Sequence, residues 1–82
     1  MKFNKNLVKF IKEENRINQR INEINRWIVE ARQEGRLGLL SHLRETITAL
    51  NLQRYELDSK YPQFRGIFLT SEETEEILNI KD

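Results

Sequence analysis

The feature that most constrains the fold is an apolar repeat, with alternating three- and four-residue spacing, that starts at Phe3. Eight of its nine positions are apolar and one is charged: Phe3, Leu7, Phe10, Glu14, Ile17, Ile21, Ile24, Ile28 and Ala31. This spacing places the apolar residues along one side of an α-helix, in a seam like that of a coiled coil. No Gly or Pro interrupts the repeat, so we predict a helix over residues 3–34.

A second repeat follows the segment Gly35-Arg36-Leu37-Gly38, whose glycines are typical of a helix end and a short turn. Its positions are Leu40, Leu43, Ile47, Leu50, Arg54, Leu57 and Tyr61. Pro62 comes next, and the residue before a proline disfavours helix. We therefore predict a second helix over residues 39–61. Two long helices that are joined by a short turn pack antiparallel.

After Pro62 the pattern changes. The apolar stretch that follows contains Gly66, and we predict an extended segment over residues 62–70. Thr70 and Glu73 have the spacing of a capping box, which predicts a short helix over residues 71–79. The predicted fold class is all-α: one domain over residues 1–82, a long antiparallel two-helix hairpin with coiled-coil-like packing plus a short C-terminal helix.

The two repeats can be aligned layer by layer across the hairpin. Pairing Ala31 with Leu40 at the turn brings Phe10 opposite Tyr61 at the open end. Each repeat has one charged member, Glu14 in the first and Arg54 in the second. These two residues then fall in adjacent layers. We predict that these two residues form an ion pair that fixes the register, although such a pair adds little net stability.

The composition gives no indication of catalysis. The chain of 82 residues has no Cys and one His, and 33% of its residues are charged. Its glycines match no nucleotide-binding fingerprint, and a hairpin offers no deep pocket. We expect no enzymatic activity, no cofactor, no metal site and no small-molecule substrate. We expect a cytoplasmic protein, because no apolar run approaches the roughly 18–20 residues that span a bilayer and no signal peptide is evident.

Several apolar residues lie outside the seam, where a two-helix hairpin cannot bury them. They are Trp27, Val29, Leu39, Ala49, Leu52 and Tyr55. Exposed aromatic and aliphatic side chains of this kind are typical of a protein interface. The simplest occupant is a second copy, which would form a homodimer with four packed helices. The alternative is that the C-terminal segment covers them, or that they are scattered single exposures.

A basic stripe runs along the predicted first helix on the side opposite the seam. Its members are Lys2, Lys5, Lys9, Lys12 and Arg16. Such a stripe suits an anionic partner such as nucleic acid. The alternative is a solvated face that the acidic last helix partly neutralises, because residues 1–44 hold ten Lys/Arg against five Asp/Glu whereas residues 45–82 hold four against eight.

These observations lead to one expectation and one alternative. We expect a small non-enzymatic protein–protein interaction module, a regulator or inhibitor of the kind that phages and mobile elements encode, which acts by occluding a partner protein. The alternative is a nucleic-acid-binding protein that uses the basic face of the first helix. Membrane attachment through that helix is the least favoured, because its seam residues would have to leave the hairpin.

Overall fold

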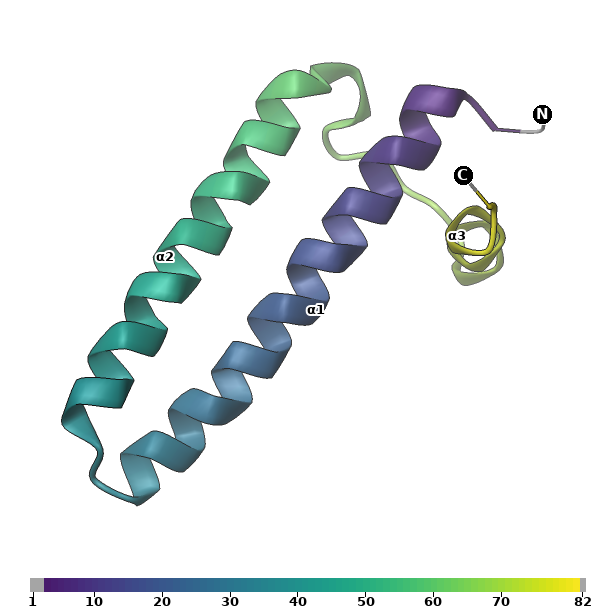
Figure 1. Cartoon of the computed structure of the whole chain (residues 1–82). Coiled ribbons are helices and arrows are strands. Elements are labelled where there is room, and N and C mark those ends of the chain that lie inside the picture. Colours follow the sequence, from purple (N-terminus) through teal and green to yellow (C-terminus); the bar gives the residue numbers. More distant parts are fainter. Residues whose placement is uncertain (1–2, 82) are drawn as a thin grey trace.

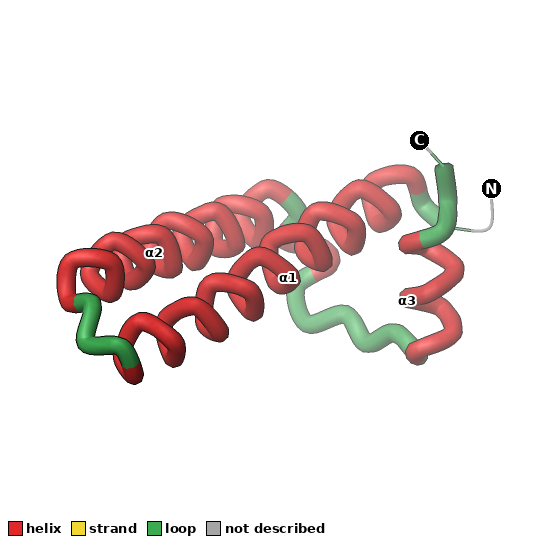
Figure 2. Tube along the Cα trace, turned by 60° about the horizontal axis from the view of Figure 1, so that its bottom comes forward, coloured by secondary structure: helices red, strands yellow, loops and turns green. Residues whose placement is uncertain are grey.

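The computed structural model describes residues 3–81 and confirms the antiparallel helical hairpin with a short C-terminal helix (Figure 1). Helix α1 spans Lys5–Gln33, α2 spans Leu37–Lys60, and α3 spans Ser71–Leu78; a 3₁₀ turn, η1, occupies Pro62–Phe64. α1 and α2 lie side by side along their length, and α3 stands beside the N-terminal half of α1 (Figure 2). The result is an elongated molecule with extents of 50 × 24 × 22 Å.

The helix bounds differ slightly from those predicted. α1 begins two residues later, because Asn4 caps it: its side chain accepts a hydrogen bond from the backbone N–H of Asn6 at 2.8 Å. α2 begins at Leu37, two residues earlier, so that Gly38 belongs to the helix and not to the turn. The turn is therefore shorter than the two glycines suggested.

Gly35 ends α1 in the conformation that the sequence predicts. Its φ of +70° lies in the left-handed region, where glycine has no Cβ penalty. The backbone N–H of Arg36 donates to the carbonyl of Ala31 at 2.9 Å, and that of Gly35 donates to Arg32 at 3.2 Å. This pair of bonds is a Schellman motif, which satisfies carbonyls at the helix end and reverses the chain.

The core lies along the predicted seam between α1 and α2. Phe10, Ile17, Ile24 and Ala31 on α1 are buried, and so are Leu40, Leu43, Leu50 and Leu57 on α2. Phe10 meets Tyr61 edge-to-face with ring centroids 6.0 Å apart, as the layer alignment predicts. Ile21, Ile28 and Ile47 are only partly buried, because a single layer of two helices leaves both sides of its seam open.

α3 covers the first turns of α1, which extend the apolar surface away from the seam. Ile77 is completely buried, and Leu7, Val8 and Ile11 of α1 are buried with it in the same cluster. The capping box holds the start of α3: the Glu73 N–H donates to the Thr70 hydroxyl at 3.1 Å, and the Thr70 N–H donates to the Glu73 carboxylate at 3.1 Å. Docking of α3 thus completes a second part of the core.

The sequence predicted an extended segment over residues 62–70, but in the structure this segment is not uniformly extended. It begins with the 3₁₀ turn, since proline suits the first position of such a turn. It then reverses at Gly66, whose φ is +75°. Only the following residues, up to Thr70, run as an irregular connector to α3. This turn brings the connector back over the side of the hairpin, where it helps to form a cleft.

Candidate functional site

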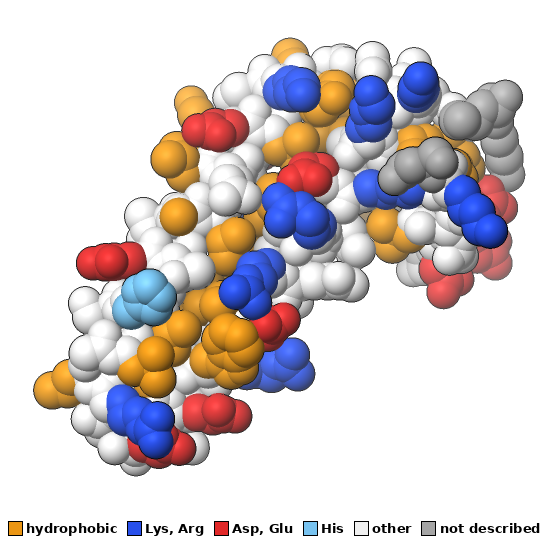
Figure 3. Space-filling model, viewed as in Figure 1, with side chains coloured by type: hydrophobic (Ala, Val, Ile, Leu, Met, Phe, Trp, Pro, Cys, Tyr) orange, Lys and Arg blue, Asp and Glu red, His pale blue; other side chains and the backbone are white. Residues whose placement is uncertain are grey.

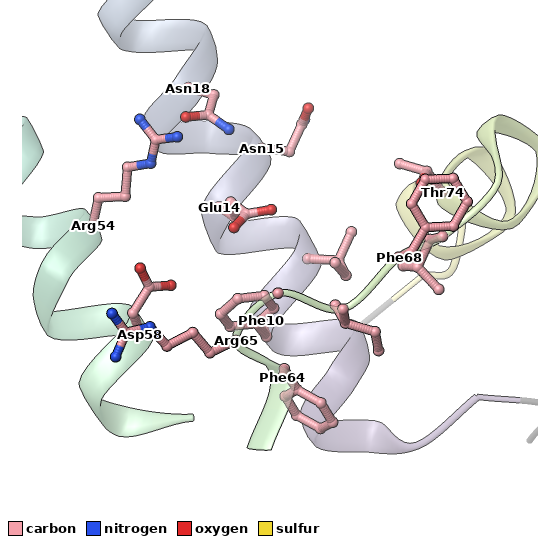
Figure 4. A pocket seen from close by; sticks show the side chains of 14 residues that line it. Phe10, Glu14, Asn15, Asn18, Arg54, Asp58, Phe64, Arg65, Phe68 and Thr74 are labelled. Atoms are coloured by element: carbon pink, nitrogen blue, oxygen red, sulfur yellow. The ribbon is translucent and has the colours of Figure 1, made fainter. Parts of the chain in front are cut away.

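A cleft of about 490 Å³ opens between α1, α2 and the connector (Figure 4). Its apolar part includes Phe10, Ile11 and Phe64, and the rings of Phe10 and Phe64 lie 5.7 Å apart between centroids. Polar side chains of α1, among them Asn15 and Asn18, line another part. The wall that the connector provides depends on the turn at Gly66, so the sequence did not predict this cleft and we expected no deep pocket in the hairpin.

Four charged side chains also line the cleft: Glu14 of α1, Arg54 and Asp58 of α2, and Arg65, which follows η1. The predicted Glu14–Arg54 ion pair is not formed, and none of the four makes a hydrogen bond or an ion pair within 4 Å in the part of the chain that the structure describes. In Figure 4 the Arg54 side chain extends toward Asn18, away from the carboxylate of Glu14. The two residues are near neighbours, as predicted, but they do not fix the register by direct contact.

The Glu14 carboxyl occupies an unfavourable site for a negative charge. Partial burial at the seam raises the pKa of Glu14, and the nearby carboxylate of Asp58 raises this pKa further. The charge of Arg54 lowers the pKa of Glu14, but this effect is the smallest of the three. Ionised Glu14 therefore opposes folding, and the cleft favours an occupant that brings a positive charge to it.

Replacing Glu14 with Gln should increase stability near pH 7 and leave it unchanged near pH 3. The raised pKa means that the folded state binds the proton more tightly than the unfolded state, so the Glu14 contribution to the free energy of unfolding falls as pH rises through its titration. The difference between the two proteins should hence grow from acid to neutral pH. Urea denaturation at several pH values measures it.

That comparison is best made in a Phe68→Ala background, which removes the self-association proposed below. Glu13→Gln is the matched control on the same helix. The hydrogen bond from Arg16 lowers the pKa of Glu13, so its contribution is present at neutral pH and is lost as pH falls. A Glu14→Gln protein that is less stable than its parent at pH 7 would contradict the unfavourable site.

At the opposite end of the molecule, Trp27 of α1 and Leu39 of α2 come together. They line a shallow hollow of about 210 Å³ next to the turn, with Ala31 and Leu43 among the other lining residues. The guanidinium of Arg20 lies over the Trp27 ring, 5.4 Å from its centroid. We call Trp27, Leu39 and Arg20 the turn-end surface, and Figure 3 shows hydrophobic side chains gathered near this end.

The other off-seam apolar residues that the sequence analysis singled out do not join this surface. Trp27 precedes the seam residue Ile28 and Val29 follows it. Two residues correspond to about 200° around an α-helix, so Trp27 and Val29 project from different sides of α1. Leu52 and Tyr55 lie about 200° and 140° around α2 from the seam residue Leu50, so they point away from α1. Val29, Leu52 and Tyr55 are exposed, and so is Ala49. Val29, Leu52 and Tyr55 therefore lie on other sides of the hairpin than the turn-end surface, and their part in binding a partner stays a prediction.

The basic stripe gains a member from the second helix. Lys9, Lys12 and Arg16 line a groove of about 540 Å³ together with Lys60 and Tyr61 of the α2 end. Lys60 lies 5.5 Å from the centre of the Tyr61 ring. Figure 3 shows Lys and Arg side chains over this end of the hairpin. Lys5 is exposed, and Lys2 lies outside the described residues.

Part of this positive charge already has partners within the chain. Glu13 also lines the groove and accepts hydrogen bonds from Arg16, one of them at 3.0 Å from Nε. The ammonium of Lys12 donates to the carbonyl of Ile80, just beyond α3. The Glu13 carboxylate offsets the charge of Arg16, so the groove is less basic than the count of Lys and Arg suggests.

Comparison with known proteins yields no match: no protein-family model, no curated protein and no solved structure matches this chain. Across residues 3–81, no helix is both long enough and apolar enough to cross a membrane. The same residues contain no group of three or more His, Cys, Asp or Glu side chains placed to hold a metal ion.

Proposed function

We propose that the chain is a non-enzymatic protein–protein interaction module, a regulator or inhibitor that acts by covering a surface of its partner. The observation that carries this proposal is the turn-end surface. Trp27, the only tryptophan of the chain, is 40% exposed and lies in a hollow with Leu39. Trp, Tyr and Arg are the residues most enriched where truncation costs an interface the most binding energy.

The surroundings of the turn-end surface also suit a protein partner. Glu30, Glu34 and Arg36 line the same hollow as Trp27, and Arg36 pairs with Glu34 at 2.7 Å. A small apolar centre with a charged rim is the usual anatomy of a protein interface. The turn is held by the Schellman motif, so the surface is preorganised and little ordering entropy opposes binding.

The test is affinity capture from the organism that encodes the chain, with the purified partner then assayed directly. Trp27→Ala with Leu39→Ala should lose the partner that the wild type retains, with at least about 30-fold weaker binding. Tyr55→Ala is the matched control, because it removes an even more exposed aromatic residue from another side of the hairpin. Equal binding by the wild type and the double variant would exclude the turn-end surface.

Nucleic-acid binding is the second candidate, favoured by the addition of Lys60 to the basic groove. If Lys9, Arg16 and Lys60 each neutralise one phosphate, duplex affinity should fall about 40-fold between 50 and 200 mM salt, since the logarithmic slope is about −0.9 per contact. Fluorescence anisotropy with a labelled duplex measures this. Binding that is absent at 50 mM salt, or that survives Lys9→Glu with Lys60→Glu, would remove this candidate.

A further inference from the structure

Phe68 is the most exposed large hydrophobic side chain in the described part of the molecule. It is 90% exposed, whereas its neighbour Leu69 is partly buried. It lies in the connector after Gly66 and forms part of the rim of the cleft, near Thr74 of α3 (Figure 4). A protruding aromatic residue therefore stands next to a cavity with an aromatic floor.

The volume and lining of this cavity suit an aromatic side chain. At about 490 Å³ the cleft is within the range of ligand-binding pockets. Phe10 lines the cleft but is only 2% exposed, so the partly buried ring of Phe64 offers most of the aromatic surface for another ring. Phe68 of the same chain forms the rim and does not fill the space.

The charges of the cleft are complementary to themselves. Two carboxylates, Glu14 and Asp58, and two guanidiniums, Arg54 and Arg65, face it without pairing to one another. In a dimer with two-fold symmetry the same surface of both copies forms the interface, so the charges of that surface must be complementary to one another. Equal numbers of unpaired acidic and basic groups, beside a knob and a hole, meet this requirement.

We propose that two copies of this chain associate around a two-fold axis at the cleft, with Phe68 of each copy inserted into the cleft of the other. Arg65 of one copy then lies against Asp58 of its partner. The turn-end surface takes no part, so this association is independent of the proposed function and goes beyond it.

The first experiment is light scattering from about 5 µM to about 500 µM, because a dimer forms by mass action. The wild type should change from the mass of one chain, 9.9 kDa, to twice that value. Phe68→Ala should weaken dimerisation at least about 30-fold. Tyr55→Ala, which is 70% exposed on α2, should dimerise like the wild type. Circular dichroism verifies that both variants remain folded.

A charge exchange tests the pairing itself. Arg65→Glu and Asp58→Arg should each weaken self-association, because each puts like charges face to face. A mixture of the two variants should form a heterodimer, since both contacts of the two-fold then join opposite charges. Native mass spectrometry distinguishes the species once one variant carries an isotope label.

Three outcomes would overturn the proposal. One is a wild type that stays at the mass of one chain up to about 500 µM, which leaves the cleft to a different ligand. Another is a dimer that survives Phe68→Ala, which places the interface elsewhere. The third is a mixture of the charge variants in which no heterodimer appears. None of these results depends on whether the turn-end surface binds another protein.

Discussion

Replacing Ile24 with Ala should lower the free energy of unfolding by about 3 kcal/mol, as expected when a large aliphatic side chain is removed from a packed core. Ile24 is 1% exposed and lies at the seam of α1, against α2. In a chain of this size that loss corresponds to a fall of roughly 15 °C in Tm. Thermal and urea denaturation followed by circular dichroism measure the change.

The matched control is Ile28→Ala, four residues further along the same helix. Ile28 is only partly buried, so its removal should cost less than half as much. Both substitutions replace isoleucine with alanine, and the gain in helix propensity is the same for each. Equal losses at the two positions would mean that the open side of the seam near Ile28 is covered, and would contradict the single-layer packing.

Replacing Ile77 with Ala should release α3 from the hairpin. Ile77 is completely buried, and it is the only fully buried residue of this eight-residue helix. An isolated helix of this length is not stable in water, so a loss of about 3 kcal/mol should unfold α3 locally. Hydrogen exchange should show the α3 amides losing protection while those near Ile24 keep theirs.

Thr70→Ala provides a graded comparison for the same helix. It removes the hydroxyl that accepts from the Glu73 N–H, and loss of such a cap costs about 1 kcal/mol. Protection of the α3 amides should then fall less than in Ile77→Ala. If Ile77→Ala unfolds α1 and α2 together with α3, the C-terminal helix is an integral part of one cooperative unit and does not open separately.

The sequence predicted the hairpin because each determinant of this fold is local. The three–four spacing of apolar residues defines one face of each helix, and Gly35 supplies the left-handed residue that ends α1. The match of Phe10 with Tyr61 follows from counting layers away from the turn. Thr70 and Glu73 act within a single helical turn, so their capping box could also be predicted.

The candidate sites were less predictable because they depend on the path of the connector and on the conformations of individual side chains. The turn at Gly66 decides where Phe68 stands, and no periodic pattern indicates it. The Arg54 side chain extends along the cleft, and layer alignment does not specify this side-chain conformation.

The elongated shape separates the two proposed interaction surfaces. Phe10, Glu14 and Asn18 of the cleft lie in the first half of α1, whereas Trp27 lies at least nine residues beyond them, about 14 Å or more along the helix axis. A pair of chains joined at their clefts would carry one turn-end surface on each arm. Such a bivalent molecule would bind a repetitive or dimeric target with an avidity well above the affinity of either arm, provided that the spacing of the target matches that of the arms.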